Sequence, residues 1–203
     1  MSDPSILTPD FDDILNERMN RLLATLNCLQ VAKIQSVNLT TQTLSAEIQV
    51  RRQLPGGVVK AYPVILDCPI IVLQGGGSYL DMPIAAGDYC LLLFNDRDID
   101  TWWDTANVAA PNSRRKHSLS DGFALVGVNP KTSVLDLDGS VVGIRGGSAK
   151  VRLDNSAETL KTLIDDLIDA ISNAVDTAGH TLNPATKAAL LAIKTRFGTL
   201  LEA

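Results

Sequence analysis

The run Asp96-Arg97-Asp98-Ile99-Asp100 places acidic side chains at alternate positions, which is the opening spacing of a calcium-binding loop. Such a loop next needs a glycine for its sharp turn and, at its end, a glutamate that binds the ion with both oxygens. Here Thr101 stands in the glycine position, Trp102 and Trp103 follow, and no glutamate closes the loop. We therefore predict no metal site, and interpret the run as a set of outward-facing charges at the end of a strand.

The other motifs that suggest chemistry also lack an essential part. The glycine-rich runs 75–77 and 143–150 resemble phosphate loops, but neither ends in Gly-Lys-Ser/Thr and neither precedes a helix at the right place. His117 and His180 have no partner at metal or triad spacing, so each is interpreted as a solvated loop histidine. The sequence predicts no catalytic, cofactor-binding or metal-binding residue, and a protein that is not an enzyme.

Trp102 and Trp103 allow more than one interpretation. Adjacent residues on a strand point to opposite faces, so we expect only one of the two in the core and the other in contact with a neighbouring subunit. In a binding module, such a tryptophan would instead stack on a sugar or on a single-stranded base. A cell-wall glycan hydrolase is a further alternative, and the clustered carboxylates Asp96, Asp98 and Asp100 are its only candidates.

Charge and cysteine content narrow the class of protein. The formal net charge of −5 disfavours nucleic-acid binding, and the basic run Arg114-Arg115-Lys116 is interpreted as a solvated loop. Cys28, Cys68 and Cys90 share no short spacing and are predicted to be buried free thiols. The N-terminus lacks a secretory signal and no apolar run approaches the roughly 18 residues of a membrane helix, so we expect synthesis in a cytoplasm and no membrane span.

Hydrophobic periodicity predicts a helix followed by short strands. Residues 10–28 carry an apolar stripe at helical spacing, and the period changes to two over 30–37 and 44–51, with a turn at 40–42 between them. Further strands are predicted over 58–66 and 68–73 and in the strand-like blocks 87–103 and 114–130. About five short strands separated by Gly and Pro turns indicate a small barrel, and their compact spacing favours an OB-like one.

After Pro130 the pattern changes twice. Very short alternating segments at 133–139, 140–147 and 149–154 are too small to close a core, so we expect them to pair between copies of the chain. Then an apolar stripe runs from Leu160 to Val175, the linker 177–183 interrupts it, and Pro184 opens a second helix. These stripes predict a helical hairpin that packs on itself and on other copies.

Two blocks of the sequence resemble the N-terminal domain of the membrane-puncturing spike proteins of contractile-tail phages. They run from Gly87 to Trp102 (Gly-Asp-x-x-Leu-Leu-Leu-Phe-x-x-Arg-Asp-Ile-Asp-x-Trp) and from Arg115 to Pro130 (Arg-x-His-x-Leu-Ser-Asp-Gly-Phe-Ala-x-x-Gly-x-x-Pro), and the resemblance covers residues 30–130. It implies an OB-fold, a homotrimer and a position on the baseplate axis beneath the tail tube, and it implies no catalytic residue. The chain differs from typical spikes because its β segment is short, a helical hairpin follows it, and it has no His-x-His metal motif.

The expected fold is therefore mainly β with helical ends. It comprises an N-terminal helix over 1–29, an OB-fold-like barrel over 30–130, a short intertwined trimeric β-prism or β-helix neck over 131–155, and a C-terminal helical hairpin over 156–203.

The expected function is that of a structural virion protein, the homotrimeric hub or spike of a contractile tail baseplate. It would take part in penetration of the host envelope or hold a separate spike tip. Expected partners are two further copies, a tail tube or hub protein at one end, and a tip protein or the host envelope at the other, with no nucleic acid and no cofactor. The alternatives are an OB-fold module that binds carbohydrate or a single strand, and a glycan hydrolase.

Overall fold

The computed structural model describes residues 10–54, 57–137, 139–140, 144, 149–175 and 178–201. The chain divides into two compact units, Met1–Leu135 and Asp136–Ala203.

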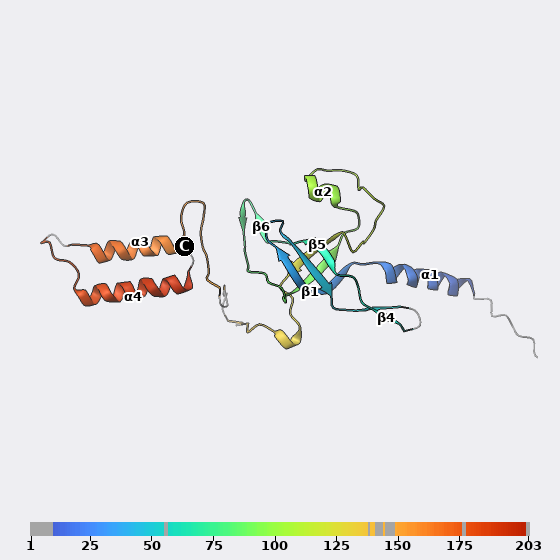
Figure 1. Ribbon diagram of the computed structural model, residues 1–203, viewed down its shortest axis with the longest axis horizontal. Helices are drawn as coiled ribbons and strands as arrows, with labels where there is room; N and C mark the ends of the chain where they lie inside the picture. The colour runs from blue at the N-terminus through green and yellow to red at the C-terminus, as the bar shows by residue number, and fades with distance from the viewer. Residues whose placement is uncertain are drawn as a thin grey trace, which may run out of the picture. The chain divides into compact units, whose positions relative to one another are not determined.

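The first unit is built on one five-stranded antiparallel sheet (Figure 1). Its strands are β1 (Leu29–Asn38), β2 (Thr43–Ile48), β5 (Ile65–Pro69), β8 (Tyr89–Phe94) and β9 (Gly122–Val126), and their order is β5-β2-β1-β8-β9. The sheet curls until its two edges meet, because Ile70 forms a parallel bridge with Ala124 and the Ile71 N–H donates to the Ala124 carbonyl at 2.8 Å. The first unit is therefore barrel-like, as the strand spacing predicts.

Alternation of side chains along the strands produces the core. In β8 every second residue is buried, namely Cys90, Leu92 and Phe94. β1 and β2 contribute in the same way, since Ala32 pairs with both Ile48 and Cys90 in register. These inward-facing apolar side chains form one continuous cluster, and the alternation in β1, β2 and β8 agrees with the period-two pattern of the sequence.

The predicted strands between residues 58 and 73 are wrong in their boundaries. The predicted strand 58–66 contains two pieces: β4 (Val59–Lys60), which pairs with β3 (Arg52–Gln53), and the first residues of β5. The predicted strand 68–73 is not a strand of its own, because its first residues complete β5. Pro63 lies between the two pieces, and proline cannot donate a ladder hydrogen bond. The glycines at 75–77 then form the tight turn between β6 (Gln74–Gly75) and β7 (Ser78–Tyr79), where Gly76 and Gly77 have φ of 59° and 84°.

Helix α1 (Phe11–Thr25) confirms the predicted N-terminal helix. The Asp10 carboxylate accepts a hydrogen bond from the Phe11 N–H at 2.7 Å, and Asp12 and Asp13 in the first turn suit the positive end of the helix dipole. No residue of α1 is buried, so its apolar stripe has no partner among the described residues of this chain.

The second unit is the predicted helical hairpin. Helix α3 (Leu160–Asn173) begins after Thr159, whose hydroxyl accepts from the Thr162 N–H. Helix α4 (Pro184–Leu200) begins after Asn183 with proline in its first turn, as predicted. Figure 1 shows the two helices side by side.

Short bridges close the hairpin at both ends. Val175 and Thr181 pair at its tip, and Val151 and Leu201 form a parallel bridge at its base, where the Val151 N–H donates to the Leu200 carbonyl at 2.9 Å. No helix in the described part of the chain is long and apolar enough to cross a membrane.

The predicted β neck at 131–155 is only partly described. Residues 138, 141–143 and 145–148 lie outside the described residues, and these include most of the predicted segment 140–147. The described part contains the 3-10 turn η1 (Lys131–Ser133) and isolated bridges at Val151 and Asp154, but no strand. Pairing of these segments between copies stays a prediction, because one chain does not test it.

Candidate functional site

The candidate site lies on the long connection between β8 and β9. The strand predicted to continue to Trp103 ends at Phe94, and residues 100–105 form the short helix α2 (Asp100–Thr105) instead. The turn that starts this helix is local: the Asp98 carboxylate accepts from the Asp100 N–H at 3.0 Å, and the Trp103 N–H donates to the Ile99 carbonyl at 2.8 Å. Carboxylates at such a turn compete with strand pairing for the backbone N–H groups.

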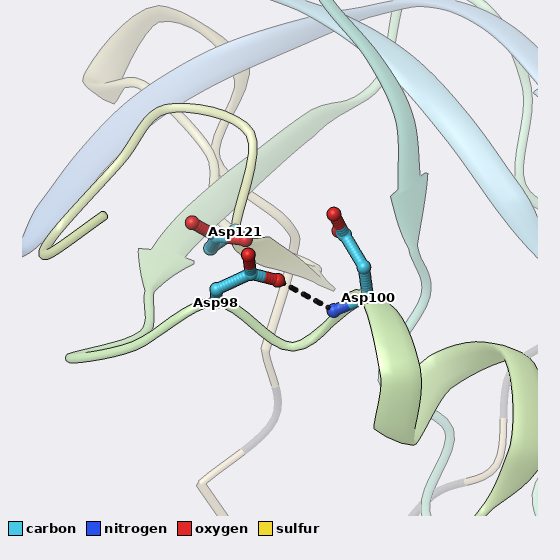
Figure 2. Close-up of side chains that lie close together, drawn as sticks. All are labelled: Asp98, Asp100 and Asp121. Carbon is cyan, nitrogen blue, oxygen red and sulfur yellow. Dashed lines mark hydrogen bonds between the residues drawn. The ribbon is translucent and has the colours of Figure 1, made fainter. Parts of the chain in front are cut away.

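Three carboxylates meet at this position (Figure 2). One oxygen from each of Asp98, Asp100 and Asp121 lies within 4.8 Å of the others. The side chains of Asp98 and Asp121 are fully buried, and that of Asp100 is half exposed. The predicted outward-facing charges are therefore wrong for Asp98, although the Asp96 side chain is 85% exposed as expected.

Arg115 neutralises much of this charge. Its Nη2 lies 3.1, 2.9 and 2.8 Å from carboxylate oxygens of Asp98, Asp100 and Asp121. Its Nε also donates to the second oxygen of Asp121 at 3.1 Å, so that pair is bidentate. Arginine suits this position because its planar donors match a carboxylate. The prediction of a solvated loop is wrong for this member of the basic run.

The hydrogen bonds of the cluster favour the charged forms of Asp98 and Arg115. The pKa of Asp98 is lowered, first by the hydrogen bond that the Ser113 hydroxyl donates at 2.6 Å, then by the Asp100 N–H and the Arg115 charge. The pKa of Arg115 is raised further above its ordinary value, mainly by its hydrogen bonds to Asp121 and Asp100. Asp98 is therefore an anion, and Arg115 a cation, at neutral pH.

This arrangement limits the chemistry of the cluster. The Arg115 guanidinium already contacts an oxygen of each of the three carboxylates, so a divalent cation would have to compete with it for them. A glycan hydrolase needs one carboxylic acid that keeps its proton near neutral pH, whereas the environment of Asp98 favours loss of its proton. The geometry therefore fits an ion-pair network better than either kind of reactive site.

The network fastens the two ends of the connection to each other. Asp98 follows β8 and Asp121 directly precedes β9, and Arg115 contacts both. The backbone and side-chain N–H groups of Asn95 also donate to the Asp121 carbonyl, at 2.8 and 2.9 Å. Helix α2 is consequently held in place although none of its residues is buried.

Helix α2 presents both tryptophans at the surface. Trp102 and Trp103 are 49% and 42% exposed, so the prediction that one of them lies in the core was wrong, because it assumed a strand. Trp102 meets the Phe123 ring edge-on at a centroid distance of 5.9 Å, and the two tryptophan rings lie 6.2 Å apart. A contact between these rings and another subunit stays a prediction.

The cysteines and histidines follow their predictions only in part. Cys68 and Cys90 are buried thiols, and burial raises their pKa values to about 12 and about 11, whereas Cys28 is exposed, contrary to expectation. His117 is mostly buried, with its Nε2 3.4 Å from an Asp96 oxygen, so it is not the solvated residue predicted. His180 is exposed at the tip of the hairpin.

Sequence reasoning missed Asp121 and Ser113. Both lie in polar turn-like stretches, Ser120-Asp121-Gly122 and Asn112-Ser113-Arg114, that are typical of solvated loops. The only available signal was the arginine two residues after Ser113, and a local spacing does not show which carboxylates an arginine will reach.

The barrel is similar in sequence to a known protein domain. Residues 31–127 match the family model described as the phage protein Gp138 N-terminal domain. A search of curated proteins gives no match. The matched range begins in β1 and ends just after β9, so it coincides with the barrel. It supports a phage structural protein, the coarser part of what the sequence resemblance implies.

Proposed function

We propose that the chain is the homotrimeric central hub or spike of a contractile tail baseplate, located in the virion on the tail axis below the tube. The observation that carries this proposal is the phage-domain match over residues 31–127, which coincides with the complete barrel. In this role the protein takes part in penetration of the host envelope or mounts a separate spike tip. Its partners are two further copies and a tail tube or hub protein.

The strand topology supports an OB-type barrel in this proposal. Five strands curl in the order β5-β2-β1-β8-β9, and the only parallel contact among them joins the two ends of that order in the described chain, at Ile70 and Ala124. A five-stranded, partly open barrel that closes through neighbours distant in sequence is the OB architecture.

The polar cluster supports a structural role rather than catalysis. Its most buried carboxylates are bound by Arg115, and its position fastens a surface connection to the barrel. An axial component of a contractile device bears compressive load, so rigid loops and interlocked copies serve it directly.

The mass of the purified protein tests the trimer. One chain has a mass of 21.7 kDa, so light scattering should give about three times that value at micromolar concentration. A stable monomer over that range would contradict the proposed assembly. Electron microscopy of intact particles with an antibody fragment bound to the barrel tests the location: the labels should surround the tail axis below the tube, and a label elsewhere on the particle would contradict it.

The exposed tryptophans favour one alternative function, a module that binds glycans or single strands. Trp102 and Trp103 are accessible and lie on a fixed helix, as stacking platforms do. Titration with cell-wall oligosaccharides and oligonucleotides while tryptophan fluorescence is recorded tests it. A saturable change would favour the alternative, and an unchanged spectrum would dismiss it.

A further inference from the structure

The strongly amphipathic helix α3 directs only part of its apolar stripe at its partner helix. Its most buried positions are Ile168 and Ser172, and Lys161 and Asp165 lie beside them on the same side. Four apolar side chains at three- and four-residue spacing remain 39–59% exposed: Leu160, Leu163, Leu167 and Ile171. The hairpin therefore forms through a partly polar seam and leaves the more apolar face of α3 open.

Helix α4 has an apolar stripe of its own. Ile193 and Leu200 are 40% and 58% exposed, and Phe197 is half-buried between them. Together with Arg196 and Thr199 these residues line a shallow hollow on the surface of the helix.

Helical geometry places the two stripes on one face of the hairpin. Successive residues turn by about 100°. When each helix is viewed from its N-terminus, its exposed apolar residues lie at a similar angle, and in the same rotational sense, from the side that contacts the other helix. Because the two helices run in opposite directions, this places both stripes on the same face of the hairpin. Leu191 is 53% exposed and points away from this face, since it lies about half a turn from Leu200.

The charges of the two helices are complementary. Helix α3 carries Asp165, Asp166 and Asp169 against the single Lys161, whereas α4 carries Lys187, Lys194 and Arg196 and no acidic residue. Within the hairpin this difference appears as the Lys194–Asp169 ion pair at 2.7 Å. Between copies, α3 against α3 or α4 against α4 would repel, and α3 against α4 would attract.

We propose that the apolar face of the hairpin is covered by other copies of the same chain, with α3 of one copy packed against α4 of the next. This inference rests on the proposed trimer and names the surface that joins its hairpins. A head-to-tail contact of this kind forms a ring when successive copies are related by a rotation that closes, and for three copies that ring is a bundle in which α3 and α4 alternate. The polar backs of the helices then face water.

The register of the hairpin makes the fit specific. A Cβ atom placed on Gly198 would lie 3.9 Å from Cε of Lys161, so residues 161 and 198 are at the same height. In a ring all hairpins point the same way, and Leu163 of one copy then reaches the level of the hollow formed by Ile193, Phe197 and Leu200 in the next. Asp166 and Arg196, both exposed on the outer sides of their helices, meet at the edge of this contact.

A matched pair of substitutions in the full-length chain tests the surface. Leu163 and Leu191 are equally exposed, at 53%, but lie on opposite faces of the hairpin. We expect Leu163→Gln, and more strongly Leu163→Gln with Leu167→Gln, to raise the concentration of half-dissociation at least about tenfold in light scattering. Leu191→Gln should leave it unchanged. Equal behaviour of the two single variants would overturn the inference.

Charge reversal gives a second test that does not depend on the apolar substitutions. Asp166→Arg and Arg196→Asp should each weaken association, and the double variant should recover it, because the two positions meet only between copies. Absence of recovery would overturn the proposed α3–α4 contact. If the wild-type chain is a trimer that none of these changes affects, the hairpin contact fails and the trimer stands; if the wild type is a monomer, both fail.

Discussion

The barrel and the helical hairpin use their apolar residues in opposite ways. In the barrel, Leu92 and Ile34 are fully buried and the curled sheet closes around them. In the hairpin, Leu163 and Leu167 are more than half exposed although α3 is the most amphipathic helix described. One chain is therefore sufficient to complete the barrel core, and the hairpin offers a surface that needs a partner.

The two units therefore differ in the interactions that hold them together. Burial of apolar area is the main stabilising contribution in the barrel, and polar groups are added where a surface loop must be fixed. In the hairpin much of the apolar area of α3 stays exposed, and the two helices are joined by a seam that includes the ion pair of Lys194 with Asp169. Both tryptophans belong to the barrel unit, so their fluorescence reports the unfolding of that unit.

The largest effect is expected for a truncation inside the barrel. Leu92→Ala removes a fully buried side chain and should lower the free energy of unfolding by about 2–5 kcal/mol. Leu167→Ala removes the same atoms from the open face of the hairpin and should leave the transition detected by tryptophan fluorescence unchanged. Denaturant titration of both variants measures the contrast, and a shift of similar size in both would break the comparison.

A smaller effect is expected for the ion-pair network. Asp121→Asn removes the charge that makes the bidentate contact with Arg115 and leaves a guanidinium that is only one-third exposed, so the expected cost is about 2 kcal/mol. Asp96→Asn is the matched control, because the Asp96 side chain is 85% exposed and should contribute less than about 0.5 kcal/mol. Equal midpoints for the two variants would show that the network does not stabilise the barrel.

The smallest effect is a dependence on pH. The pKa of Asp98 is lowered in the folded state, so its contribution is present above its unfolded pKa of about 3.9 and is lost as the pH falls through the lower folded value. The stability difference between the wild type and Asp98→Asn should therefore be constant near neutral pH and disappear under strongly acidic conditions. Thermal unfolding from pH 7 to pH 2 measures it, and a difference that grows toward acid would contradict the assigned direction.

Local sequence patterns predicted the helices and strands better than the tertiary contacts that their side chains make. The alternation in β1 and β2 and the first-turn position of Pro184 depend on neighbouring residues, and both were predicted correctly. The end of β8 was not predicted, because the block after Phe94 has strand-like composition, and the turn is formed by hydrogen bonds such as the one from the Asp100 N–H to the Asp98 side chain. The burial of Asp98 depends on Arg115 and Ser113, which return from the far side of the connection.

In the hairpin, too, the elements could be predicted from the sequence but their contacts could not. Its helices and their apolar stripes could be predicted from spacing, whereas the direction of the α3 stripe relative to α4 could not, because it depends on how Ile168 and Ser172 are seated against the second helix. Helical periodicity identifies a face but not the surface that the face meets.

The parallel bridge between Val151 and Leu201 determines what a molecular label on this protein would report. The polypeptide passes Val151 at one end of the hairpin and returns to the same end at Leu201, so a fluorophore attached beside Leu201 marks the base of this unit. A reporter for its opposite end has to be inserted in the loop closed by Val175 and Thr181, where His180 is exposed. A pair of labels at these two positions would give the polarity of the hairpin in an assembled particle.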